Sequence, residues 1–340
     1  MRRSSEQERA AVRTAKIPNP EDLDVLELLP ALRALECSGL SDEDLEWVCG
    51  LGLPLTFLHL SWCARLTTVQ PLSRMKSLLR LVLSDCPALK EIAALSHLVN
   101  LRQLEIINAD QVWEIESLAT LTGLEKLAIR NCDGVEDLAP LSRLRELVSL
   151  DLSRCDKVKE LGPVNKLRKL VSLNLSDCNA LQDISPLREL DNLEELQLFG
   201  CNLVKDLRPL YHMCYLRNLS LPNEATDGEL LAICLEHSEL EQLDLRNCQN
   251  IGDLSPLARL RHLTHLTLAG CHNVRDLGPL ASLADLVRLD LACCPAVTSL
   301  APPHGLKKLA DLYIGGCINL GRDSVRRFKE ACPHCAVHIV

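Results

Sequence analysis

Ten cysteines recur at a nearly constant interval, and this feature constrains the fold more than any other. Successive members of the set are 23 or 46 residues apart, with one interval of 47. Leu40, Ala109 and Glu224 stand where the interval predicts a cysteine, which gives thirteen register positions. The ten register cysteines are Cys63, Cys86, Cys132, Cys155, Cys178, Cys201, Cys248, Cys271, Cys294 and Cys317. Such a period predicts a stack of similar units, each contacting only its neighbours.

The residues around each register position also repeat. The segments "LVSLDLSRCDKVKELGPVNKL" (147–167) and "LEQLDLRNCQNIGDLSPLARL" (240–260) share L-x-x-L-x-L-x-x-C. The alternation predicts a short strand with one buried face. From residue 29 onward the pattern resembles the leucine-rich repeat family. The resemblance implies an α/β solenoid, or horseshoe, with a parallel sheet on the concave face and short 3-10 or α segments on the convex face.

The second half of most units contains a proline eight residues after the register position. An acidic residue precedes many of these prolines by three positions, as Asp137, Glu160, Asp183, Asp206, Asp253 and Asp276 do. Proline is favoured in the first turn of a helix, and a carboxylate there accepts free amides. Each proline therefore predicts a short helical turn. The prolines are Pro71, Pro140, Pro163, Pro186, Pro209, Pro256, Pro279 and Pro302.

Two units lack the proline, and the ends of the chain differ from the repeats. "SDEDLEWVCGLG" after Leu40 and "ATDGELLAICLEHSEL" after Glu224 predict longer α-helices. We interpret residues 1–28 as an N-terminal helical cap, opened by a Ser5…Glu8 capping box and broken at Pro18. Residues 29–320 hold the repeats. Residues 321–340 are predicted to form a cap helix from near Asp323 and a terminal half-repeat strand.

The terminal segment "ACPHCAVHIV" contains a Cys-x-x-Cys pair, Cys332 and Cys335, beside His334 and His338. This spacing is typical of a redox pair or half of a zinc site. One period beyond Cys317, however, the buried strand positions fall on residues 332, 335 and 337. We therefore favour a core role and keep a metal or redox role as the alternative. No phosphate loop or catalytic dyad is recognisable, so the sequence predicts a non-enzymatic protein without a cofactor.

Charge and cysteine content bear on partners and compartment. The formal charge of −9 argues against nucleic acid as the main partner. No apolar run approaches the roughly 20 residues that membrane insertion requires. Closely stacked thiols favour a reducing compartment, so we expect a cytoplasmic protein. If the Arg-rich N-terminus is a transit peptide, the protein is instead mitochondrial.

The solvent-facing strand positions are the candidate binding surface, because packing uses the repeating ones. The chain has only nine aromatic residues, and several fall on or beside this face, where arginines and aromatics commonly anchor interfaces. We expect Arg130 and Arg246 to face solvent. The predicted partner is a protein, in a larger complex or alone. The cysteine-type 23-residue repeats resemble those of trypanosomatid leucine-rich repeat proteins described as adenylate cyclase regulators. This resemblance implies a regulatory or assembly subunit. The predicted contact residues are Phe57, His59, Trp62, Arg80, Arg130, Asp151, Phe199, Arg246, Arg288 and Tyr313.

Overall fold

Fifteen strands form an open sheet in which the order of the strands is their order in the chain. The computed structural model describes residues 11–301 and 305–339. These residues divide into two compact units. Unit 1 comprises residues up to 170 together with 178–181, and unit 2 comprises 171–177 with 182 onward. The predicted α/β leucine-rich repeat solenoid is confirmed as the fold class.

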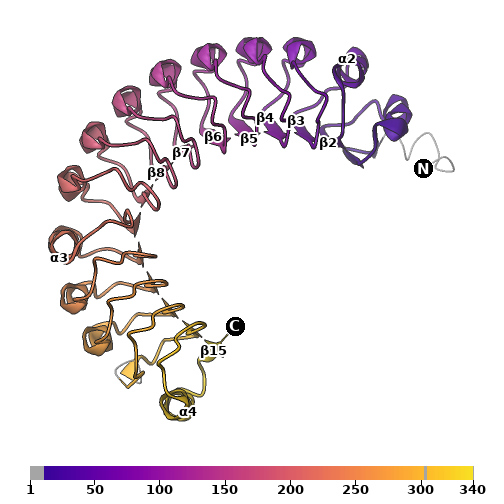
Figure 1. Cartoon of the computed structure of the whole chain (residues 1–340). Coiled ribbons are helices and arrows are strands. Elements are labelled where there is room, and N and C mark those ends of the chain that lie inside the picture. Colours follow the sequence, from indigo (N-terminus) through magenta and orange to yellow (C-terminus); the bar gives the residue numbers. More distant parts are fainter. Residues whose placement is uncertain (1–10, 302–304, 340) are drawn as a thin grey trace. The chain divides into compact units, whose positions relative to one another are not determined.

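From residue 12 onward, the described part of unit 1 contains seven strands, one α-helix and six 3-10 segments. Its strands pair in parallel, and within the unit they line the inner side while the helical segments lie outside (Figure 1). The strands are β1 (Thr14–Ile17), β2 (Ala34–Ser38), β3 (Phe57–Ser61), β4 (Arg80–Ser84), β5 (Gln103–Ile107), β6 (Lys126–Arg130) and β7 (Ser149–Asp151). The other elements are η1 (Pro20–Leu28), α2 (Asp42–Gly50), η2 (Gln70–Arg74), η3 (Ala93–His97), η4 (Glu116–Thr120), η5 (Ala139–Arg143) and η6 (Gly162–Lys166).

Unit 2 repeats this plan with shorter strands. The strands are β8 (Ser172–Asn174), β9 (Glu195–Gln197), β10 (Asn218–Ser220), β11 (Gln242–Asp244), β12 (His265–Thr267), β13 (Arg288–Asp290), β14 (Asp311–Tyr313) and β15 (Ala336–His338). The helical segments are η7 (Ser185–Glu189), η8 (Arg208–His212), α3 (Asp227–Glu236), η9 (Ser255–Arg259), η10 (Gly278–Ser282) and α4 (Arg322–Ala331). Each strand from β8 to β14 directs one leucine, such as Leu243 or Leu266, into the core.

The short helical turns predicted from the prolines are present. Each proline in a described turn occupies one of the first two positions of a 3-10 segment. Asp137 Oδ1 accepts the backbone N–H of Ala139 at 2.8 Å. Asp183, Asp206, Asp253 and Asp276 make the same contact two residues onward, at 2.7–3.0 Å. These carboxylates therefore satisfy an amide that the short turn leaves free. Pro302 lies outside the described residues.

The two longer helices and the terminal strand are confirmed. Ser41 and Thr226 open α2 and α3 with complete capping boxes. Helix α4 begins at Arg322, next to the predicted start at Asp323. In β15, Val337 lies opposite Leu312 of β14, so the last residues complete a half-repeat.

The predicted N-terminal helix does not extend to Pro18, because residue 11 is helical but residues 14–17 are a strand. Residues Thr14–Ile17 form strand β1, which pairs in parallel with β2, and Pro20–Leu28 form a 3-10 segment. A strand is favoured here because the edge of β2 carries unpaired N–H and C=O groups that only another strand satisfies in series. The Ser5…Glu8 capping box lies outside the described residues.

A column of left-handed residues, which the repeat pattern did not predict, directly precedes the register positions. In unit 1, Asn108 donates to Asp85 at 2.6 Å and Asn131 donates to Asn108 at 2.9 Å, forming a side-chain ladder. Glycine occupies some positions of the column, Gly39 in unit 1 and three in unit 2. A Cβ on Gly270 would lie 2.1 Å from Asn247 Oδ1. The residues with positive φ in this column are Gly39, Trp62, Asp85, Asn108, Asn131, Arg154, Asp177, Gly200, Asn247, Gly270, Cys293 and Gly316.

Candidate functional site

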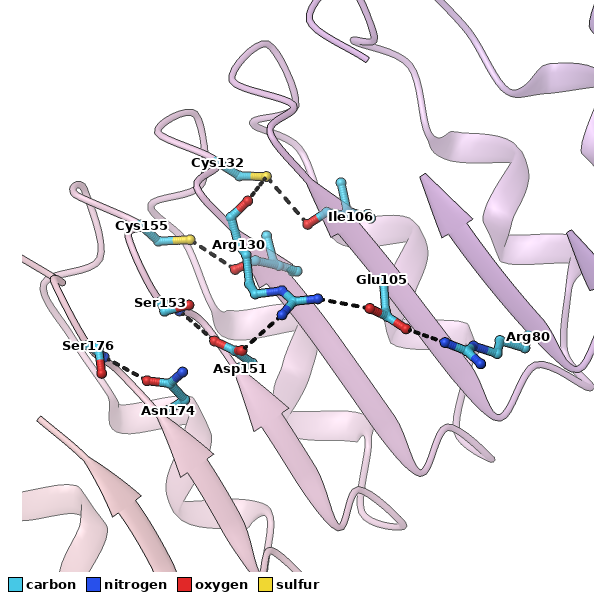
Figure 2. A network of polar contacts seen from close by, with 11 residues as sticks. Arg80, Glu105, Ile106, Arg130, Cys132, Asp151, Ser153, Cys155, Asn174 and Ser176 are labelled. Carbon is cyan, nitrogen blue, oxygen red and sulfur yellow. Dashed lines mark hydrogen bonds and ion pairs between the residues drawn. The ribbon is translucent and has the colours of Figure 1, made fainter. Parts of the chain in front are cut away.

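In unit 1, a chain of charged side chains crosses the solvent-facing side of the sheet. Arg80 lies over the Phe57 ring at 5.2 Å and bonds to Glu105 at 2.9 Å. Glu105 also accepts from Arg130 at 2.9 Å, and Arg130 reaches Asp151 at 3.9 Å (Figure 2). The network links four successive strands, β4 to β7, with alternating charges. It brings together four of the predicted contact residues and adds Glu105.

Arg130 differs from expectation, because its guanidinium does not simply face solvent. Its side chain is 38% exposed and engages two carboxylates. Its Nε is buried and has no hydrogen-bond partner within the described part of the chain. The register spacing placed Arg130 on the correct face, but it could not show that Glu105 lies within reach. Arg130 therefore stabilises the free protein as well as being accessible to a partner.

The N-terminal end of this face carries an aromatic residue and a polar pair. Trp62 is 70% exposed and has a φ of 55°, a conformation that costs energy for a bulky residue. His59 Nε2 lies 3.0 Å from the hydroxyl of Ser84, whose side chain is nearly buried. The Trp62 ring is therefore available to a partner.

In unit 2, Arg246 repeats the arginine-aromatic arrangement. It lies over the Phe199 ring at 5.6 Å and pairs with Asp244 at 3.4 Å. Burial raises the pKa of Asp244, and the charge of Asp290 acts in the same direction. The Phe199 ring is half-buried, so the stack presents one face of the guanidinium to solvent. A planar guanidinium held in this way suits a carboxylate or another ring.

A second stack in unit 2 involves the end of the chain. Arg288 lies over the Tyr313 ring at 5.6 Å, and Tyr313 stacks on His338 with centroids 4.3 Å apart. His338 Nε2 is 3.1 Å from Asp311, which also pairs with Arg288 at 3.5 Å. The hydrogen bond from His338 lowers the pKa of Asp311. Sequence reasoning missed His338 as a surface residue, although its register opposite Tyr313 follows from the predicted terminal strand.

Asp151 has a structural role that the sequence prediction did not include. Its Oδ1 accepts the backbone N–H of Ser153 at 2.9 Å (Figure 2). Asn174, Asp244 and Asp290 bond in the same way to the amide two residues onward. This contact ends the three-residue strands. Because asparagine serves equally at 174, the bond does not require the charge of the aspartates.

From Cys132 onward the register cysteines donate to carbonyl groups of the preceding unit, whereas Cys63 and Cys86 donate to the carbonyl groups of Ser61 and Ser84 in their own units, as expected for small apolar side chains with a weak donor. Cys155 Sγ lies 3.1 Å from the carbonyl oxygen of Ile129, and Cys201 Sγ lies 2.9 Å from that of Leu175. All 17 cysteines are free thiols in the structure. Burial raises the pKa of Cys155 and of Cys271 to about 12. These thiols are therefore protonated packing groups at neutral pH.

This burial predicts a sharp division in thiol reactivity. Cys214 and Cys293 are exposed and Cys317 is intermediate, whereas the other fourteen are buried. We expect Ellman's reagent to modify Cys214 and Cys293 quickly in the native protein at pH 8. In guanidinium chloride all 17 thiols should react. A count well below 17 in the unfolded, unreduced protein would show disulfides and contradict the packing role.

The C-terminal Cys-x-x-Cys pair lies in the core, as favoured from the register. Cys332 is 2% exposed and Cys335 is 8% exposed. Burial raises the pKa of both thiols, that of Cys335 to about 11. This is opposite to the lowered pKa of a reactive redox cysteine. Across residues 11–301 and 305–339, no three His, Cys, Asp or Glu side chains are grouped to hold a metal ion.

None of the described helices has the length and apolar character to cross a membrane. The longest α-helices, α3 and α4, have ten residues each.

Comparisons with known proteins agree with this architecture. The family model for leucine-rich repeats in two copies matches residues 145–189 and 168–212. An internalin (inlF) of Listeria monocytogenes is 23% identical, with a TM-score of 0.56 over 95% of this chain and 84% of its own. A leucine-rich repeat protein of Leptospira interrogans is 19% identical, with a TM-score of 0.61 over 98% and 97%. The search of curated sequences gave no significant match. At these identities the likeness shows the fold: the chain forms a leucine-rich repeat solenoid, and its residues 145–212 match the repeat family's model.

Proposed function

We propose that this chain is a non-enzymatic module that binds a protein partner through the solvent-facing side of its strands. The leucine-rich repeat fold is commonly a protein-interaction module, and the observation that carries the proposal is the repeated arginine-aromatic stack. Three such stacks occur at Phe57–Arg80, Phe199–Arg246 and Tyr313–Arg288, with 5.2–5.6 Å between guanidinium and ring. Arginine and aromatic residues dominate the energetics of protein interfaces.

The stacks suit binding because their geometry is set before the partner arrives. Each arginine is held by a ring and by a carboxylate on the same face, such as Asp244 for Arg246 and Asp311 for Arg288. A long side chain that is already ordered in the free protein loses less conformational entropy when the partner binds. The partner surface should therefore present carboxylates or rings opposite the guanidinium groups.

The proposal extends to role and compartment. A module of this kind, with many buried thiols, fits a cytoplasmic regulatory or assembly subunit that acts within a larger complex. The thiol column is the support for a reducing compartment, because neighbouring strands bring the register cysteines close enough to risk wrong disulfides.

Binding should depend on the stacked residues. We expect Phe199→Ala and Arg246→Glu each to weaken the complex at least tenfold, because each removes a pre-ordered anchor at the centre of a patch. The partner is first captured with the wild-type chain and identified by mass spectrometry. Its dissociation constant is then measured by calorimetry with each purified variant, and Phe57→Ala examines the corresponding stack of unit 1.

Arg208→Glu is the matched control. Arg208 lies in the convex turn η8, is 78% exposed and pairs with Asp206. Its reversal changes the net charge as much as Arg246→Glu does, yet it should alter the dissociation constant less than twofold. Unchanged binding in the Phe199, Arg246 and Phe57 variants, with loss in the convex variant, would place the interface elsewhere.

A further inference from the structure

A tryptophan stands exposed outside the strand surface, in the loop between β5 and η4. Trp113 is 65% exposed and lies four residues after the register position Ala109. Other units place polar or small residues there, so no packing requirement calls for an indole ring. The equivalent residues are Thr67, Lys90, Glu136, Lys159, Gln182, Lys205, Gly252, Arg275 and Thr298.

Trp113 borders a hollow of about 410 Å³, which also contacts Gln70, Lys90, Glu91 and Ser117. The comparable hollow beside Pro163, farther along unit 1, measures about 210 Å³. The difference has a basis in the sequence, because Ser117, which lines the larger hollow, stands where the next unit has Pro140.

The hollow has a firm base. Thr68 and Glu91 form a parallel β-bridge, and the N–H of Lys90 donates to the carbonyl of Thr67 at 3.0 Å. Ser117 Oγ donates to the carbonyl of Ile92 at 3.2 Å. The loops that carry the lining residues are thus tied to one another through their backbones.

The charges around Trp113 are predominantly negative. Glu91 and Glu114 line the larger hollow, and Glu114, Glu116 and Asp137 line a second one of about 280 Å³, which Trp113 also borders. Lys90 is the single cation among the residues that line these two hollows. Within the described chain, the carboxylates of Glu91, Glu114 and Glu116 make no ion pair. Four carboxylates and one ammonium group therefore surround an exposed aromatic face.

We propose that Trp113 and these carboxylates form a docking site for an arginine side chain on a basic segment of a partner protein. An indole face is the strongest aromatic acceptor for a cation. A guanidinium stacks flat on a ring and can also donate in a fork to a carboxylate, which an ammonium group cannot do. The site is separate from the strand surface, so it binds its ligand independently of the stacked arginines there.

Fluorescence anisotropy with a fluorescein-labelled hexa-arginine peptide, at 0.15 M salt, tests the site directly. Trp113→Ala should weaken binding about fivefold, and Glu91→Gln/Glu114→Gln about tenfold. The wild-type chain should prefer hexa-arginine to hexa-lysine about threefold, and Trp113→Ala should remove that preference. Circular dichroism confirms that each exposed substitution leaves the fold intact.

Two matched controls separate a specific site from general attraction to an acidic protein. Glu27→Gln/Glu43→Gln removes the same charge from exposed positions elsewhere in unit 1, and Tyr215→Ala removes another exposed aromatic ring, outside both proposed surfaces. Both should change affinity less than twofold. Equal losses in the two glutamate pairs, or less than a twofold effect of Trp113→Ala, would overturn the proposal.

Discussion

Raising the pH from 7.5 to 10 should remove most of the stability of this protein. Burial raises the pKa of several thiols from 9.0 to about 12. In the folded chain these groups stay protonated, whereas in the unfolded chain they ionise above pH 9. Their contribution to stability is therefore complete below pH 9 and is lost as the pH rises toward 12. The six thiols are those of Cys37, Cys49, Cys155, Cys234, Cys271 and Cys294.

The size of the effect follows from the proton balance. At pH 10, each such thiol lowers the free energy of unfolding by about 1.4 kcal/mol. Six of them together amount to roughly 8 kcal/mol, which is comparable to the whole stability of a typical protein. Urea unfolding followed by circular dichroism at pH 7.5, 9 and 10 measures the change.

Two variants show whether the thiols are responsible. Cys271→Ala should lower stability at pH 7.5 but reduce the steepness of the pH dependence, since one ionisable buried group is gone. Cys214→Ala changes an exposed thiol and should leave that steepness unaltered. A urea midpoint that stays the same between pH 7.5 and 10 would contradict the explanation.

The second large effect is expected at Ser220, whose side chain is 1% exposed. Its hydroxyl oxygen accepts the backbone N–H groups of Leu198 at 2.9 Å and of Phe199 at 3.0 Å. Ser220→Ala removes both bonds and leaves at least one amide without a partner away from water. We expect a loss of about 2–4 kcal/mol in the free energy of unfolding.

Ser220 also bears on the binding surface, because one of its bonds holds the backbone of Phe199. In Ser220→Ala, the ring should lose its fixed position under Arg246, and the partner should bind more weakly than stability alone explains. Ser172→Ala on β8, at a half-buried position, is the control and should cost less than about 0.5 kcal/mol. Equal urea midpoints for Ser220→Ala and the wild type would show that water replaces the hydroxyl.

Ser220 also illustrates where sequence reasoning stops. The repeat pattern assigns Ser220 to the solvent-facing column of strand residues that also contains Asp244 and Asn174. Those residues bond to the amide two positions onward, but the corresponding residue after Ser220 is Pro222, which has no N–H. The hydroxyl bonds instead to the preceding strand. The sequence shows that Ser220 is an exception only once it is known that residues of this column bond to the amide two positions onward.

The general architecture was predictable because it depends on a sequence pattern that repeats at a fixed interval. Register cysteines, strand leucines and turn prolines each repeat every 23 residues, so a single alignment fixes thirteen units. The arginine network was not predictable in the same way. Whether Arg130 forms a hydrogen bond with Glu105 depends on the length and direction of side chains on two neighbouring strands. Neither property repeats every 23 residues in the sequence. The N-terminal strand was missed because β1 is specified by the free edge of β2, not by its own four residues.

The left-handed column has a consequence for how such a chain can be lengthened or shortened. A Cβ on Gly200 would lie 2.2 Å from Asp177 Oδ1, and one on Gly316 would lie 2.8 Å from Cys293 Sγ. Each of these glycines leaves room for the side chain of the unit before it. The units are thus not interchangeable modules: cutting one out or duplicating one changes which residues become neighbours in this column. Exchange of units by recombination, in nature or in a design laboratory, should therefore be tolerated only where the new neighbours in the column fit each other, as a side chain and a following glycine do at these positions.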